Sequence, residues 1–144
     1  MAEGLAAIGL AGNIIQFISF SFVLVSKTKE LHQSVSGTLN ENVDLEIISQ
    51  DIRTLSKRIT ASACSTRRLS EIAHRCDTIA KELLDAVTKL HRKYGPRSGN
   101  LPTRWQSFRR ALESVWGKAH IEELKARLGA LRDQVAMHLV SDTK

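Results

Sequence analysis

The sequence predicts an all-α protein, an up-and-down bundle of four to five helices with a hydrophobic N-terminal helix. Leu, Ile, Ala, Lys, Arg and Glu dominate the 144 residues and are mostly good helix formers. Two prolines provide fewer turn signals than a sandwich or barrel needs, and no segment alternates convincingly as a strand. We expect a single domain over 1–144, with helices at approximately 3–34, 40–61, 66–94, 103–116 and 118–140.

The expected first helix contains the most unusual stretch of the chain. The twenty-three residues between Glu3 and Lys27 carry no charge. That length meets the threshold of about 20 residues for a helix that crosses a bilayer. Small and polar residues recur along it at spacings of three and four, which places them on one narrow stripe: Gly9, Gly12, Asn13, Gln16 and Ser19. The rest of the circumference is apolar, so this helix must lie inside a bundle or meet lipid.

Residues 34–42 form a connector, in which Gly37 can end the first helix and Thr38 or Asn40 can cap the second. The second helix has apolar residues spaced by four, three and four: Ile48, Ile52, Leu55 and Ile59. The third shows the clearest heptad spacing, through Leu69, Ile72, Cys76, Ile79, Leu83 and Leu90. Gly95 and Pro96 form the strongest stop signal.

Pro102 and Thr103 start the expected fourth helix, which carries one apolar face of Trp105, Phe108, Leu112 and Val115. The last helix repeats the spacing of threes and fours at Ile121, Leu124, Leu128, Leu131, Val135 and His138. Its phase does not continue that of the fourth helix, so we expect a break near Gly117.

The net charge of +6 is unevenly distributed. Residues 1–50 have a net charge of −3 and residues 51–144 one of +9. A run of seven basic residues without an acid consists of Lys89, Arg92, Lys93, Arg97, Arg104, Arg109 and Arg110. Such a patch attracts phosphates on lipid or on nucleic acid, although a solvated loop between helix ends is the simpler interpretation.

The sequence has no catalytic, cofactor-binding or metal-binding motif, so we predict no enzyme, no cofactor and no metal. The five histidines are scattered over separate helices. Cys64 and Cys76 lack the spacing of a metal site, and free thiols in a reducing cytosol are the simple interpretation.

Three stretches resemble the N-terminal helical domains of fungal STAND proteins, the NLR-like receptors. They are MAEGLAAIGLAGNIIQFISFSFVLVSKTKELHQSVSG, RCDTIAKELLDAVTKL and RWQSFRRALESVWGKAHIEELKARLGALRDQVAMHL. The resemblance is to the HeLo-like and SesA-like domains and spans nearly the whole chain. It implies a cell-death or heterokaryon-incompatibility effector, normally followed by a nucleotide-binding oligomerisation domain.

In death-inducing relatives the hydrophobic first helix targets membranes. By position, this role falls on Leu5, Ile8, Leu10, Ile14, Ile15, Phe17, Ile18, Phe20 and Phe22. Asn13 and Gln16 are costly in lipid unless they pair across helices. Insertion would therefore favour oligomers in which the stripe of Gly9, Gly12, Asn13 and Gln16 faces inward.

We therefore expect a cytoplasmic effector that is recruited to the plasma membrane on activation and there forms a homo-oligomer. Anionic lipids would meet the basic run, and a downstream nucleotide-binding domain in cis or a related effector in trans would be its protein partner. A soluble adaptor without membrane activity is the alternative. Nucleic-acid binding ranks last because the basic run straddles a loop with one aromatic residue.

Overall fold

The computed structural model describes residues 2–26, 32–33, 39–40, 45–62, 67–94 and 105–142, with side chains for 8–26, 45–62, 67–93 and 108–138. Five helices and one pair of very short strands make up this part of the chain. They are α1 (Ala2–Val25), β1 (His32–Gln33), β2 (Leu39–Asn40), α2 (Leu45–Ala61), α3 (Arg67–Tyr94), α4 (Trp105–Trp116) and α5 (Lys118–Asp142). The predicted all-α bundle with a hydrophobic N-terminal helix is confirmed.

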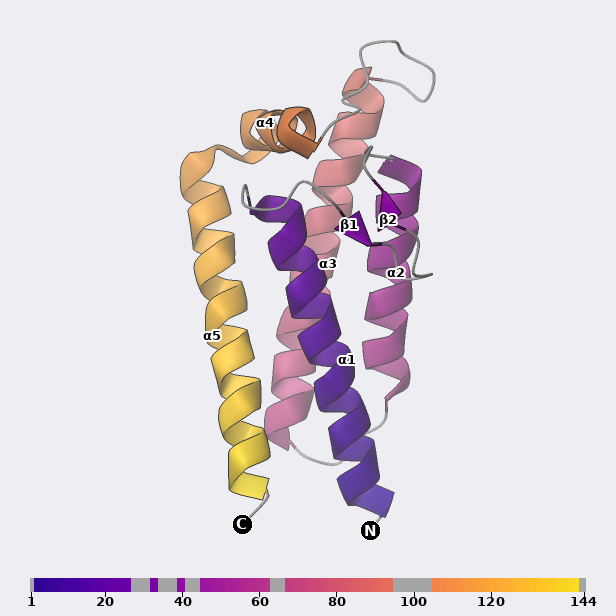
Figure 1. The fold of residues 1–144 in the computed structure, drawn as a ribbon, viewed down its shortest axis with the longest axis vertical. Helices are drawn as coiled ribbons and strands as arrows, with labels where there is room; N and C mark the ends of the chain where they lie inside the picture. Colours follow the sequence, from indigo (N-terminus) through magenta and orange to yellow (C-terminus); the bar gives the residue numbers. More distant parts are fainter. Residues whose placement is uncertain are drawn as a thin grey trace.

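Four long helices run alternately up and down, and α4 lies across one end of them (Figure 1). α1 packs against α2, α3 and α5, and between Ile8 and Ser19 its fourth side is exposed. The N-terminal end of α1 and the C-terminal end of α5 lie at the end of the bundle opposite α4. This arrangement makes α1 one wall of the bundle rather than its centre.

The first helix is shorter than predicted. It ends at Val25 instead of residue 34, and His32–Gln33 pairs antiparallel with Leu39–Asn40. The apolar spacing that anchors α1 stops at Val25, and the polar residues that follow offer no continuous apolar face to bury. Asn40 lies in β2 and is therefore not the cap of α2, which begins at Leu45.

The break between α4 and α5 falls at Gly117, as the change of phase predicted. Gly117 has a φ of 83°, which disfavours any residue with a Cβ. Its N–H donates to the Glu113 carbonyl at 2.6 Å, and its own carbonyl accepts from the N–H of Ile121 at 3.3 Å. One residue thus closes the last turn of α4 and opens the first turn of α5.

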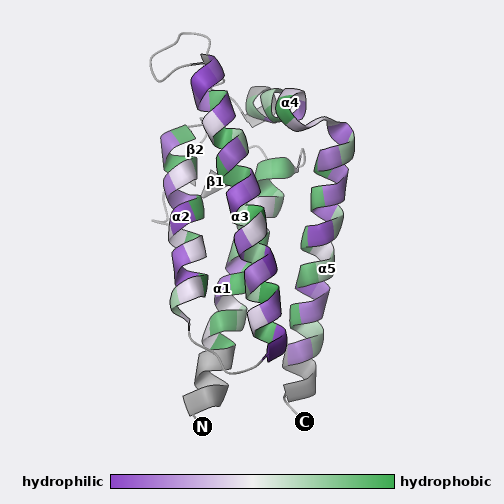
Figure 2. Cartoon of the chain, turned by 180° about the vertical axis from the view of Figure 1, so that it is seen from behind, coloured by the Kyte–Doolittle hydropathy of each residue, from purple (hydrophilic) through white to green (hydrophobic). Residues whose placement is uncertain are grey.

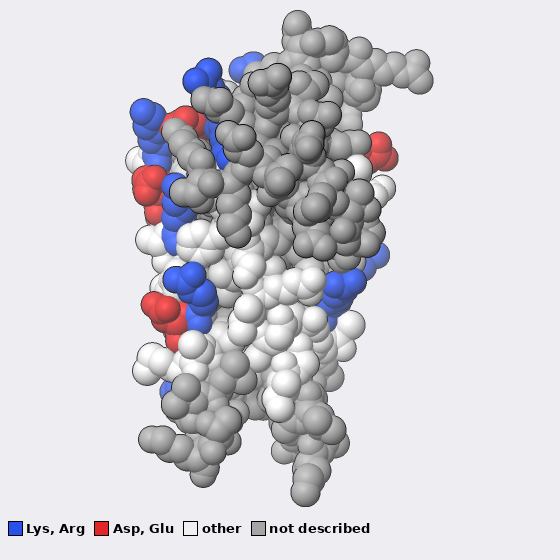
Figure 3. All heavy atoms as spheres, in the orientation of Figure 1, with Lys and Arg blue, Asp and Glu red and all other residues white. Residues whose placement is uncertain are grey.

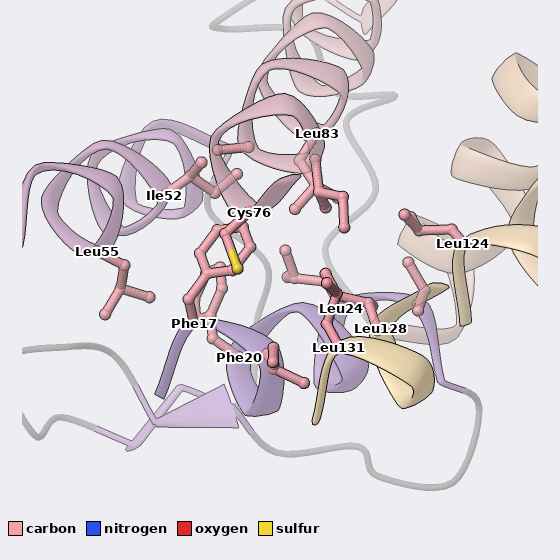
Figure 4. Packing of buried hydrophobic residues seen from close by; sticks show 14 of the residues in the cluster. Phe17, Phe20, Leu24, Ile52, Leu55, Cys76, Leu83, Leu124, Leu128 and Leu131 are labelled. Carbon is pink, nitrogen blue, oxygen red and sulfur yellow. The ribbon is translucent and has the colours of Figure 1, made fainter. Parts of the chain in front are cut away.

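A continuous apolar core fills the bundle. Figure 4 shows Phe17, Leu55, Cys76 and Leu128 pointing into the same interior from four different helices. The heptad residues predicted for α3 are all buried, and so is His138 on α5. Burial raises the pKa of the Cys76 thiol to about 12, so Cys76 stays a neutral packing residue. Cys64 and the Trp105 side chain lie outside the described residues.

Candidate functional site

The uncharged α1 helix is the natural starting point for a functional site. Its window Ile8–Val25 is long and apolar enough to cross a membrane, by length and composition, and half of that window is buried in the bundle. Seen from behind, α1 is mostly hydrophobic, whereas α3 and α5 mix hydrophilic and hydrophobic residues around their circumference (Figure 2). The core helix of a soluble protein shares these properties, so the side chains must be placed individually.

Most of the residues predicted to target membranes face the core. Leu10, Ile14, Phe17, Ile18 and Phe20 are buried, and Phe22 is partly buried against the core. Ile8 and Ile15 are exposed, at 62% and 37%. The Leu5 side chain lies outside the described residues. In the packed bundle, therefore, Ile8 and Ile15 are the described residues of the predicted membrane-targeting set that lipid could reach.

Four residues of the stripe of small and polar residues are exposed in this bundle, and Asn13 is half-buried. Together with the two exposed isoleucines, these four form a surface that we call the exposed α1 face: Ile8, Gly9, Gly12, Ile15, Gln16 and Ser19. Among the described residues, a Cβ built on Gly9 or Gly12 would meet nothing within 4 Å, so there is open space beside both glycines. The prediction that the stripe faces inward concerns an oligomer and stays a prediction.

One edge of the exposed α1 face is fastened to the C-terminal end of α2. The Asn13 side-chain amide donates to Ser62 Oγ at 2.7 Å and to the Arg58 carbonyl at 3.3 Å. Arg58 Nη1 donates to Gln16 Oε1 at 3.4 Å. The Arg58 carbonyl is among the last four of α2 and also accepts from Ser62 Oγ at 2.7 Å, so Asn13 joins a small polar network that closes the helix end.

A second fastening holds the C-terminal end of α1. Arg109 of α4 is 5% exposed, and its Nη2 donates to the Val23 carbonyl at 2.9 Å. The negative end of the α1 dipole lies there, so a buried guanidinium is favourable at this place. Arg109 had been predicted to contact lipid headgroups. Its burial corrects that prediction, because in this state it stabilises α1 from inside the bundle.

The rest of the predicted basic patch is spread around the α4 end of the bundle. Lys89, Arg92, Lys93 and Arg110 are exposed, and Lys89 forms an ion pair with Asp85 at 3.1 Å. Arg97 and Arg104 lie outside the described residues. The described part of the patch is therefore solvated surface at the end of α3 and on α4, separate from the exposed α1 face.

Two arginines that the sequence did not single out flank the exposed α1 face. Arg58 of α2 contacts Gln16, and the guanidinium carbon of Arg132 of α5 lies 5.5 Å from the centre of the Phe22 ring. Arg58 lies in a basic stretch without acids between Asp51 and Glu71 that was not singled out, and Arg132 stands beside Asp133. Only the packing of α2 and α5 on either side of α1 places one of these arginines at each edge of the exposed α1 face.

The described residues offer little to catalysis. They contain no cluster of three or more His, Cys, Asp or Glu residues able to hold a metal ion. A groove of about 330 Å³ lies between α3 and α5, lined by Arg75, Arg127, Ile79 and Leu131 among others. Arg127 is held there by Glu82, with Nη1 2.9 Å from Oε2. The chain matches no family model, no curated protein and no solved structure.

Proposed function

We propose that this chain is a cell-death or innate-immunity effector or signalling domain of a fungal NLR-like receptor. It would act in the cytoplasm by oligomerising and targeting the plasma membrane through α1. One observation supports this most directly. The sequence carries no charge between Glu3 and Lys27, and α1 buries most of its large apolar residues and leaves an uncharged face outside.

In this proposal the described bundle is the inactive state. The buried residues of α1 become available to lipid only when the helix leaves α2, α3 and α5. Release has to break the polar contacts of Asn13 and Arg109 and uncover Phe17 and Ile18. A ligand or a neighbouring subunit can shift this equilibrium only by binding the released state more tightly than the packed one.

A soluble adaptor without membrane activity is the second candidate. The burial of half of the Ile8–Val25 window favours it, because a helix with that degree of burial is also what a permanent core helix shows. In an adaptor, α1 never leaves the bundle, and partners bind its exposed surfaces.

A reversible tether on α1 separates the two candidates. In a Cys64→Ser background, Asn13→Cys and Ser62→Cys replace two side chains in hydrogen-bond contact, and a reducible bis-maleimide joins them. Cys76 does not compete, because it is buried and its pKa is about 12. Dye leakage from phosphatidylserine-containing vesicles is measured while a C-terminal chemically induced oligomerisation tag assembles the protein.

We expect the tethered protein to leave the vesicles intact and reduction of the tether to restore leakage. The matched control places the same crosslinker within one helix, at Asp85→Cys and Lys89→Cys, where it should have no effect. Leakage that the α1–α2 tether does not change would contradict the proposal. The absence of leakage from the reduced, oligomerised protein would favour the adaptor.

A further inference from the structure

The exposed α1 face is an uncharged strip with an arginine of a neighbouring helix on either side. Figure 3 shows uncharged surface over the N-terminal half of α1, with Lys and Arg side chains on both sides of it and Asp and Glu side chains mainly on the α5 side. α2 contributes Arg58, which contacts Gln16 of α1, while its acids Glu46 and Asp51 lie nearer its N-terminal end. α5 contributes Arg132, beside the exposed Asp133.

Both nearest arginines are anchored to α1 itself. Arg58 is held by Gln16 on one side, and Arg132 lies over the Phe22 ring on the other. Because each guanidinium is positioned by a residue at the margin of the strip, the cations stay beside the uncharged surface. The side-chain entropy lost when either arginine binds an anion is correspondingly smaller.

The strip has the dimensions of a shallow docking surface. Ile8 and Ile15 are seven residues apart, which puts them two turns or about 10 Å apart on the same side of the helix. Between them Gly9 and Gly12 present no side chain, so the backbone can come close to whatever covers it. Two apolar side chains project from a surface whose other exposed residues are uncharged.

We infer that the exposed α1 face docks the packed bundle onto an anionic lipid surface, with α1 still in place. Ile8 and Ile15 enter the interface between headgroups and acyl chains, and Arg58 and Arg132 contact the lipid phosphates or carboxylates. This inference rests on the proposed function and adds a step to it. The bundle first binds the membrane along α1, before any buried residue is uncovered.

The charges favour lipid over a second copy of the chain. In a symmetric dimer the same face meets itself, which brings arginines on one copy toward arginines on the other. A nucleic acid would complement the arginines but offers no apolar layer to Ile8 and Ile15. An anionic bilayer complements both features at once.

Vesicle flotation of the full chain, without any oligomerising trigger, tests the inference. We expect the protein to float with phosphatidylcholine vesicles that contain phosphatidylserine and to stay behind with phosphatidylcholine alone. Arg132→Gln should lower the partition coefficient about five-fold, since one basic residue near such a surface contributes about that factor. Ile8→Gln should lower it about ten-fold.

The chain provides a matched control for each change. Arg75→Gln removes an exposed arginine in the groove between α3 and α5. Met137→Gln removes a side chain that is 68% exposed and lies one helical turn beyond Gln134 of the same groove. Both controls should float like the parent. Equal loss in the controls, or flotation independent of phosphatidylserine, would overturn the inference.

Hydrogen exchange on the floated protein distinguishes this inference from the proposed function. We expect the amides of α1 to stay protected in the docked state, and dye to stay inside the vesicles. Leakage on oligomerisation that is insensitive to Ile8→Gln and Arg132→Gln would preserve the proposed function and contradict the docking surface. Docking with no leakage under any condition would preserve the docking surface and contradict the proposed function.

Discussion

α1 and α3 bury similar apolar faces but expose opposite ones. α3 covers its outer side with charge, including the ion pairs Arg67–Glu71, Lys81–Asp77 and Lys89–Asp85 at 3.4, 3.1 and 3.1 Å. α1 exposes two isoleucines, two glycines, a glutamine and a serine. Exposed ion pairs of this kind contribute little to stability, so the charge on α3 serves solubility more than folding. The uncharged outer face of α1 consequently points to contact with something other than water.

The inward faces should respond alike, and they give the largest expected effects. Phe17→Ala on α1 and Leu83→Ala on α3 both empty positions that are at most 1% exposed. We expect losses in the free energy of unfolding of about 3–5 and 2–5 kcal/mol, because each leaves a cavity that the bundle fills incompletely. Urea denaturation measures both. A loss below about 1 kcal/mol for Phe17→Ala alone would mean that α1 is loosely held.

The next largest effect is expected at the contact between Arg109 and the C-terminal end of α1. Arg109→Gln removes a buried charge-assisted hydrogen bond to the Val23 carbonyl, for which we expect a loss of about 2 kcal/mol. The neighbouring Arg110 is exposed, and Arg110→Gln serves as the control with little change. Hydrogen exchange should rise first at the C-terminal end of α1. Equal effects of the two substitutions would contradict the role of Arg109.

The comparison also shows what the sequence could reveal. Periodicity located α3 to within one residue and predicted the break at Gly117, because both follow from local spacing and backbone chemistry. The predicted end of α1, residue 34, lies nine residues beyond the observed end at Val25. In the sequence, Gly37 offers the stop signal of the first helix, whereas β1, which lies before Gly37, pairs with β2, a contact that no helical periodicity encodes.

The site depended on packing that the sequence does not record. The uncharged run and its stripe of small residues were visible, but not which side would face water. Arg109 was assigned to a surface patch from its place in a basic run, although α4 folds over the end of α1 and buries it. Arg58 and Arg132 come from helices distant in the chain, so only their contacts with Gln16 and Phe22 identify them.

A glycine on α1 offers a substitution that should raise the free energy of unfolding instead of lowering it. Gly12→Ala adds a methyl group to open space in the middle of a helix, and we expect the free energy of unfolding to rise by about 1 kcal/mol. Gly117→Ala should instead lower it by about 1 kcal/mol or more, because its φ of 83° strains any residue with a Cβ. Thermal unfolding compares the two. Destabilisation by Gly12→Ala would indicate that the exposed α1 face is covered in solution.

The smallest expected effect on folding carries the sharpest test of the contrast between α1 and α3. Ser19→Glu puts one carboxylate on the exposed α1 face, and Thr88→Glu puts one on the charged face of α3. Both side chains are exposed, so each change should alter the free energy of unfolding by less than about 0.5 kcal/mol.

The two variants have the same net charge, and a general loss of attraction to anionic vesicles would affect them equally. If α1 meets the lipid, Ser19→Glu alone should lower the partition coefficient at least about five-fold, because its carboxylate is pressed against like charge. Equal partitioning of the two variants would mean that the uncharged face of α1 is not the surface that docks.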